Sequence, residues 1–338
     1  MIGTLLALLV FFALFGIFLT QYVPLWMTDN EAQFTAQAGT SFAQLKSFID
    51  SQYLIGGPSV YGTSITLSSQ GVPLIAQPTQ GTLTFSPTAC PGGFYAHGIK
   101  HATTSNYGQP VNSTFCDFEN ITISPGPGAS TMFSDHAATG VLQMTLPNRY
   151  YTGQTFYLED DAVIQSQGGP YELVSIAPPF NVTTVAGNTS LTTSFLQLSG
   201  NASSITGQGT QQIFSHLRFS QTIRSVGRIV NGAPVPNSLN VTFEIGTPNP
   251  CAWENFLWSV MNTSGIPDVL HPTTGTSSYN WTAPGTANAT GGPLLTKPYL
   301  FCSNPAGFTT IIALNLNSVD FATIFYAGVQ LTLGLGGT

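Results

Sequence analysis

The pattern of apolar and polar residues predicts a long helix at the start of the chain. Met1 to Val23 is almost entirely apolar, and the first charged residue is Asp29. An apolar segment of about 20 residues is long enough to cross a lipid bilayer as a helix. From Leu25 to Tyr53, apolar residues recur at steps of three and four with polar residues between them, which is typical of an amphipathic helix. These recurring residues are Phe34, Ala38, Phe42, Leu45 and Ile49.

Pro24 lies between the two helical segments, and we expect it to kink the helix without ending it. The sequence therefore predicts one helical unit over residues 1–53. Such a helix would be about 75 Å long at about 1.5 Å per residue, far more than a bilayer requires. The part beyond the bilayer needs another apolar surface to cover it.

After Gly56-Gly57-Pro58 the helical period ends, and short runs that alternate between apolar and polar residues begin. Such runs, separated by Gly, Pro, Asn and Ser, are typical of β-strands. The runs are TSITLSS, GTLTFS, GVLQMTL, QTFYLE, DAVIQS and YELVSIA, then, after Pro178-Pro179, SLNVTFEI, TTIIALNLN and GVQLTLGL. We expect an α+β fold with a mainly-β head of one or two β-sandwich-like subdomains, over residues 57–177 and 178–338.

One short helix is expected in the second half of the head, at about residues 250–264. Asn249 can cap this helix, and Pro250 suits its first turn. Trp253, Phe256, Leu257, Val260 and Met261 would form its apolar face, and Gly265 would close it.

The charge content is low, because Asp, Glu, Lys and Arg make up 6% of the chain against about 25% in an average soluble domain. The net charge is −7, and the seven Lys and Arg residues are scattered. A protein that tracks phosphates needs a basic stripe, so we expect no nucleic-acid partner. Few carboxylates also mean few ion pairs that protonation could break, which predicts tolerance of acid down to about pH 3.

Nine Asn-x-Ser/Thr sequons predict an extracytoplasmic glycoprotein with covalent N-glycans and no other cofactor. They are Asn112, Asn120, Asn181, Asn188, Asn201, Asn240, Asn262, Asn280 and Asn288. The four cysteines fit the same compartment. Local pairing would join Cys90 to Cys116 and Cys251 to Cys302, although four cysteines allow three connectivities. Because no pair has CxxC spacing, no metal site is expected there.

Three groups of polar residues could carry chemistry, and each has a simpler interpretation. Glu159-Asp160-Asp161 could bind Ca²⁺, but adjacent strand residues point to opposite faces, which favours a solvated strand end. His97 and His101 have i, i+4 spacing but lie in a Gly-rich stretch, which favours a loop. Ser134-Asp135-His136 cannot stack as a catalytic triad, because its members are consecutive. The common hydrolase, metalloprotease and nucleotide-binding motifs are absent, so we expect no enzyme.

The apolar segment has no basic residue before it, the first Lys or Arg being Lys46. Signal sequences normally begin with a basic region. We therefore expect the numbering to begin at a processed end, where a basic leader was removed and the apolar helix kept, as in prepilin-type maturation. The alternative is that Met1 is the true start of a simple anchor.

An apolar helix that continues into an amphipathic one, followed by a β-rich glycosylated head, resembles archaeal type IV pilins and archaellins. The stretches VLQMTLPNRYYTGQTFYLEDDAVIQSQGG and LSGNASSITGQGTQQ are similar to the heads of large archaeal pilin-like surface proteins. One departure is Leu5, where bacterial members usually carry a glutamate. The resemblance implies a structural subunit of a cell-surface filament whose helices pack together. The residues expected in that filament core are Leu5, Leu9, Phe12, Phe15, Gly16, Phe18, Pro24, Phe34, Phe42 and Leu45.

The same resemblance implies several partners: identical copies, the cytoplasmic membrane before assembly, an assembly ATPase, a platform protein, and surfaces or cells that the filament touches. It does not separate an adhesion pilus from a swimming filament. The alternative is a monomeric, membrane-anchored surface glycoprotein that acts as an adhesin or envelope component. A secreted carbohydrate-binding module is a third interpretation, because aromatic residues such as Tyr150, Tyr151 and Trp253 could contact sugars.

Overall fold

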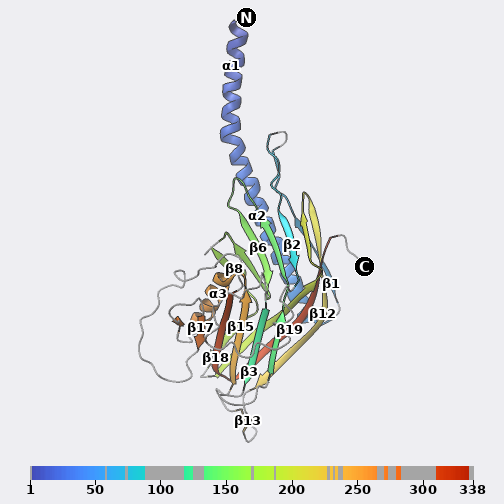
Figure 1. Ribbon diagram of the computed structural model, residues 1–338, viewed down its shortest axis with the longest axis vertical. Coiled ribbons are helices and arrows are strands. Elements are labelled where there is room, and N and C mark those ends of the chain that lie inside the picture. Colours follow the sequence, from blue (N-terminus) through green and yellow to red (C-terminus); the bar gives the residue numbers. More distant parts are fainter. Residues whose placement is uncertain are drawn as a thin grey trace.

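The protein consists of a long helix that projects from a β-rich head (Figure 1). The structure is a computed structural model. It describes residues 2–57, 59–72, 75–87, 118–124, 133–168, 171–185, 188–226, 229–230, 233–234, 239–264, 270–272, 279–282 and 310–334. The long N-terminal helix and the mainly-β head confirm the expected α+β class.

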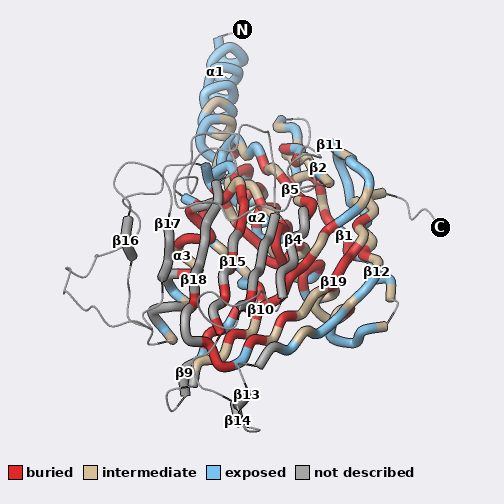
Figure 2. The backbone as a smooth tube through the Cα atoms, turned by 60° about the horizontal axis from the view of Figure 1, so that its bottom comes forward, coloured by how far each residue is buried: buried red, intermediate tan, exposed pale blue. Residues whose placement is uncertain are grey.

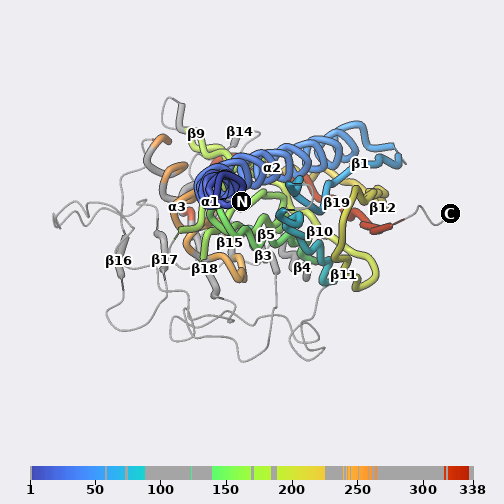
Figure 3. The backbone as a smooth tube through the Cα atoms, turned by 90° about the horizontal axis from the view of Figure 1, so that it is seen from above, coloured from blue at the N-terminus to red at the C-terminus, as the bar shows by residue number. Residues whose placement is uncertain are grey.

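The long helix has three consecutive parts, α1 (Ile2–Ile17), a π-helical turn η1 (Phe18–Tyr22) and α2 (Val23–Ile55). Pro24 stands in the first turn of α2. A proline inside a regular α-helix would clash with the carbonyl four residues earlier. The π-turn relieves this conflict, because the Val23 N–H donates to the Phe18 carbonyl one residue further back than in an α-helix. Viewed end-on to α1, α2 leaves at an angle, so the helix bends and continues as expected (Figure 3).

The helix ends two residues later than the predicted position 53. Gly56 adopts the left-handed conformation with φ 70°, and its N–H donates to the Gln52 carbonyl at 3.0 Å. This is the usual glycine stop at a helix C-terminus.

The described residues of the head form three large sheets and one small one. The first sheet has five strands in the order β1-β12-β19-β10-β9, and only the β10–β19 pair within it is parallel. Its strands are β1 (Val60–Thr66), β9 (Asn181–Val185), β10 (Asn188–Gly200), β12 (Thr210–Val226) and β19 (Phe321–Leu333).

The second sheet is antiparallel in the order β11-β2-β5-β6-β7-β8, and the third has the order β16-β17-β18-β15-β3-β4. The second contains β2 (Thr82–Ser86), β5 (Val141–Leu146), β6 (Gln154–Glu159), β7 (Ala162–Ser166), β8 (Glu172–Ile176) and β11 (Ser203–Thr206). The third contains β3 (Phe118–Ser124), β4 (Phe133–Ala138), β15 (Leu239–Thr247), β16 (Leu270–Pro272), β17 (Tyr279–Thr282) and β18 (Thr310–Val319). A two-stranded sheet joins β13 (Ile229–Val230) and β14 (Ala233–Pro234).

Each of the nine runs that alternate in sequence contains a strand. The division expected at Pro178-Pro179, however, does not separate the sheets. In each large sheet, strands from before and after this point pair directly: β1 with β12, β2 with β11, and β3 with β15. The two halves of the head are therefore joined by backbone hydrogen bonds.

Two apolar cores fill the head, one of them against the long helix. The core beside α2 lies between the first and second sheets, and the expected apolar face of α2 is buried in it: Phe34, Ala38, Phe42, Leu45 and Ile49. The other core lies under the third sheet and α3 (Pro250–Thr263), where Trp253 and Leu257 are buried. The predicted helix at residues 250–264 is thus confirmed, and its Trp253 face packs as expected.

Candidate functional site

The segment that stands out on the surface is the apolar half of the helix. All of α1 is exposed except the half-buried Gly16, and burial against the head begins at Val23. In Figure 2 this exposed helix projects from the buried interior of the head. It is long and apolar enough to cross a membrane, and it could anchor the protein there or act as a signal sequence. The large apolar side chains exposed along α1 are Ile2, Leu5, Leu6, Leu8, Leu9, Val10, Phe11, Phe12, Leu14, Phe15 and Ile17.

The residues expected in a filament core fall into two groups. Leu5, Leu9, Phe12 and Phe15 are exposed, and Gly16, Phe18 and Pro24 are half-buried, so all are open to a neighbour. Phe34, Phe42 and Leu45 are at most 2% exposed, inside the head's own core. Assigning these three to contacts between subunits was therefore wrong. The apolar surface that the long helix needs beyond the bilayer is supplied by the sheets of the same chain.

Small residues leave room on α1 for a second helix. A Cβ atom added at Gly3 or at Gly16 would meet nothing within 4 Å. Ala7 and Ala13 add two further small side chains on the same helix. Small residues let helix backbones approach closely, which strengthens packing between apolar helices.

Glu31 fastens the first turns of α2 to two loops of the head. Its carboxylate is 0% exposed and accepts hydrogen bonds from the backbone N–H groups of Arg149, Tyr150 and Tyr151, at 2.7 to 3.1 Å, and from the Thr79 hydroxyl. Burial alone would raise the pKa of Glu31, but these four donors outweigh it and hold the pKa below its usual value. Sequence periodicity gave no sign of this residue's role, because Glu31 reads as part of the polar face.

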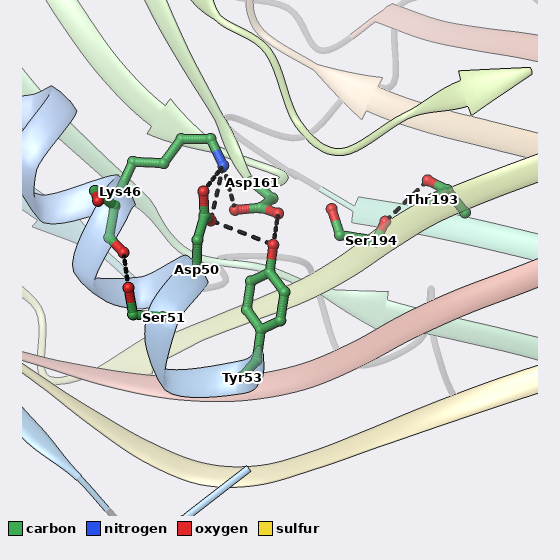
Figure 4. Close-up of polar contacts among 8 residues, drawn as sticks. Lys46, Asp50, Ser51, Tyr53, Asp161, Thr193 and Ser194 are labelled. Carbon is green, nitrogen blue, oxygen red and sulfur yellow. Dashed lines mark hydrogen bonds and ion pairs between the residues drawn. The ribbon is translucent and has the colours of Figure 1, made fainter. Parts of the chain in front are cut away.

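A second polar cluster fastens the end of α2, where Lys46 lies between two carboxylates (Figure 4). Its ammonium group donates to Asp50 at 2.8 Å and to Asp161 at 3.0 Å, and Lys46 and Asp161 are 2% and 0% exposed. The Tyr53 hydroxyl contacts both carboxylates at 3.3 Å. Burial alone would lower the pKa of Lys46, but the charges of Asp161 and Asp50 raise it above its ordinary value. Burial and the nearby Asp161 charge raise the pKa of Asp50 to about 6.

The three consecutive acidic residues are buried, so the expected solvated strand end was wrong. Glu159, Asp160 and Asp161 are each 0% exposed, and Asp160 and Asp161 have φ values of 45° and 59° in the two-residue turn between β6 and β7. Such turns require positive φ, which Asp tolerates.

The turn directs neighbouring carboxylates to different helices, because Asp161 meets α2 while Glu159 meets the start of α3. Glu159 accepts hydrogen bonds from Thr247, Asn249 and Trp253 at 2.6 to 2.9 Å, and burial raises its pKa despite these donors. The Asn249 side-chain amide, which the sequence suggested as a helix cap, therefore donates to the Glu159 carboxylate. Among the described residues no group of three or more His, Cys, Asp and Glu could hold a metal ion.

The raised pKa values of buried carboxylates predict that the free energy of unfolding is greatest in mildly acidic solution. Burial raises the pKa of Glu254 to about 7, and that of Asp50 is about 6, against ordinary values of 4.5 and 3.8. The folded protein then keeps protons that the unfolded chain releases, so stability should rise by about 3 kcal/mol as the pH falls from about 7 to about 5. The pKa of Glu31 lies below its ordinary value of 4.5, so the contribution of Glu31 to stability is lost as the pH falls below 4.5. The pKa of Lys46 lies above its ordinary value of 10.5, so the contribution of Lys46 is lost as the pH rises above 10.5.

Thermal unfolding of the full chain in detergent, followed by circular dichroism across pH, measures this effect. The double variant Asp50→Asn, Glu254→Gln should lose the rise between about pH 7 and pH 5. A steady fall in unfolding temperature over that range in the parent protein would contradict the assignment.

The described residues include only some of the predicted modification sites. Asn181 and Asn201 are exposed. The structure describes only the backbone of Asn120, Asn188, Asn240, Asn262 and Asn280, and Asn112 and Asn288 lie outside the described residues.

Cys251 is buried and disulfide-bonded. Because Cys90, Cys116 and Cys302 lie outside the described residues, the pairing stays a prediction. His97 and His101 also lie outside the described residues, and Ser134-Asp135-His136 form part of β4.

An open cleft of about 640 Å³ lies between β8 and α3 and is lined by side chains that include Gln165, Tyr171, Asn255 and Phe256. Of the aromatic residues that suggested sugar binding, none whose side chain the structure describes lines this cleft. Trp253 is 1% exposed in the core, and Tyr150 and Tyr151 are absent from the lining of this cleft. The cleft therefore adds no support to the carbohydrate-binding interpretation.

Comparison of the chain with known protein families, with curated proteins and with solved structures finds no significant match.

Proposed function

We propose that this protein is the structural subunit of an extracellular filament of the type IV pilus kind, polymerised through α1, with the β-rich head facing solvent. The observation that carries the proposal is an apolar helix of membrane-spanning length that lies outside the head and is rigidly joined to it. The architecture is compatible with a pilin.

The energy of assembly would come from the exposed side chains of α1. Eleven large apolar side chains are exposed there, and burying each contributes about 1.5 to 3 kcal/mol, so their removal from water amounts to about 15 to 30 kcal/mol per subunit. In lipid the same helix gains little from meeting its copies, because acyl chains are already apolar. Extraction from the membrane would therefore need an external motor, whereas the finished filament would resist dissociation.

The join between helix and head suits a subunit that bears load. The carboxylate of Glu31 and the ion pairs of Lys46 fix both ends of the buried part of α2 to the head. Force on the helix bundle would then pass to the head through the 11 buried residues of α2 rather than through a flexible linker. Identical contacts repeated without ring closure give a helical fibre.

Shearing of cells that make the protein, followed by negative-stain microscopy without detergent, tests the proposal. We expect fibres that contain this chain, and mass spectrometry of the first residues would establish whether a leader was removed. Recovery of the protein only as single molecules extracted by detergent would favour the membrane-anchored glycoprotein instead. The same fractions would report whether the sequon asparagines carry glycans.

A further inference from the structure

Two loops of the head flank the helix where it leaves the head. One lies between β1 and β2, where the structure describes residues 68–72 and 75–80, and the other joins β5 to β6 over residues 147–153. Both reach from the head in the direction of α1 (Figure 1). No described residue of either loop belongs to the apolar core beside α2.

Hydrogen bonds hold both loops at one level of the helix. The Asn30 amide donates to the Gln70 carbonyl at 3.0 Å, and the Glu31 carboxylate accepts from Thr79. On the other side Glu31 accepts from the backbone N–H of Tyr150 at 2.7 Å and of Tyr151 at 2.8 Å. The loops are therefore fixed relative to the helix, not merely near it.

Several of the side chains exposed at this level are aromatic or apolar, and they lie beside exposed polar residues such as Gln70 and Gln77. Trp26 is 45% exposed, Tyr150 43%, Tyr151 37% and Ile75 42%. Within residues 68–80 and 147–153 the only charged side chain is Arg149, and on the adjoining turn of α2 Asp29 is exposed whereas Glu31 is buried. Trp and Tyr with an occasional Arg are the residues enriched where a membrane protein meets the headgroup layer.

The length of the exposed helix places this level at a bilayer surface. The stretch from Ile2 to Tyr22 is about 31 Å long at about 1.5 Å per residue, which matches a hydrocarbon core about 30 Å thick. Residues from Val23 onward would then enter the headgroup layer. The bend at η1 turns α2 away from the axis of α1 (Figure 3).

We propose that Tyr22, Trp26, Ile75, Tyr150 and Tyr151 form a lipid-binding collar, which seats the head on the headgroup layer of the bilayer that α1 spans. The collar orients the subunit in the membrane before assembly. The inference rests on the membrane-inserted stage of the proposed function and does not require polymerisation. It assigns the loops to lipid rather than to a neighbouring protein.

Site-directed spin labelling of the full chain in vesicles of phosphatidylcholine and phosphatidylglycerol tests the collar. Single nitroxides are introduced through Tyr150→Cys, Leu9→Cys and Tyr171→Cys, and the parent chain treated in the same way gives the background labelling. Accessibility to oxygen and to a water-soluble nickel chelate then reports the depth of each label. Tyr171 is 71% exposed on the second sheet and provides the solvent reference.

We expect the label at position 9 to lie at hydrocarbon depth and the label at position 171 to lie in water. The label at position 150 should lie at headgroup depth, with several-fold lower nickel accessibility than the label at position 171. Adding Glu31→Gln to the Tyr150→Cys protein should raise nickel accessibility at 150, because the loop loses its charged acceptor. Circular dichroism of each variant establishes that the head is folded.

Three results would overturn the collar in different ways. A water-exposed label at position 9 would reject membrane insertion and the collar together. An inserted label at 9 with a label at 150 as accessible as that at 171 would reject the collar alone. Protection of 150 only in assembled fibres would assign the loops to contacts between copies of the chain.

Discussion

The variant Leu9→Lys is expected to abolish filaments while the protein still reaches the membrane. Leu9 is 69% exposed on α1, and Ile2 to Tyr22 contains no carboxylate that could pair with a new cation. In a bundle of identical helices the lysines would meet at the same depth without counter-charges. A buried, unpaired charge at a cost of about 4 kcal/mol would weaken each subunit addition about a thousandfold. Fibres counted in sheared material by microscopy measure the loss.

The matched control is Leu9→Met, which keeps the volume and the apolar character and should assemble normally. Insertion is checked separately by alkaline extraction of membranes. One lysine costs about 3 kcal/mol in a spanning helix, which the other apolar residues of α1 offset. Abundant fibres from inserted Leu9→Lys protein would refute packing through α1.

Replacing Lys46 by methionine should destabilise the head by about 3 to 5 kcal/mol, because it leaves the buried Asp161 and its neighbour Asp50 without a counter-charge. This is a large fraction of the total stability of an ordinary domain, which is about 5 to 15 kcal/mol. Denaturant unfolding of the full chain in detergent micelles, followed by circular dichroism, gives the change in the free energy of unfolding.

The control removes every charge of the cluster, with Lys46→Met, Asp50→Asn and Asp161→Asn together. Asn tolerates the positive φ of position 161, so the turn between β6 and β7 is preserved. Since buried ion pairs add little net stability, this triple variant should recover most of the loss. A single Lys46→Met variant that loses less than about 1 kcal/mol would mean that the cluster is solvated rather than buried.

The helix and the nine alternating strands were predictable because their periods are strong and their boundaries carry Gly and Pro. The sequence also predicted correctly that the face formed by Phe34, Ala38 and Phe42 is buried, but it did not predict which surface covers that face. Periodicity indicates that one face of a helix is covered and does not identify the covering element. Resemblance to filament subunits suggested a neighbouring helix, whereas the sheets of the same chain cover this face.

The two long strands β10 and β12 escaped prediction for a physical reason. In β10, both faces carry buried residues, Leu191 and Phe195 toward one core and Leu196 and Leu198 toward the other, so the apolar alternation is lost. In β12 the inward Ser215 is 0% exposed while Phe219 is 41% exposed, and the register shifts between Leu217 and Phe219. A strand shows a period of two in its sequence only when its buried residues are apolar and its exposed residues are polar.

The buried carboxylates of the candidate site were equally invisible. Glu31 and Asp161 lie 130 residues apart, and each depends on donors brought by other elements. Acidic residues are mostly solvated, so sequence reasoning correctly favours exposure until tertiary structure supplies partners.

The pairing of β19 with β10 and β12 constrains how the chain is made. β19 completes the first sheet, which lies against α2, and it is translated after every other strand that the structure describes. The N-terminal segment would enter the translocation machinery long before residues 321–333 exist. During that interval the apolar face of α2 has no complete sheet to pack against. Contacts between residues so far apart in sequence also form slowly. The apolar face of α2 is therefore fully covered only after β19 has been made and has paired with β10 and β12.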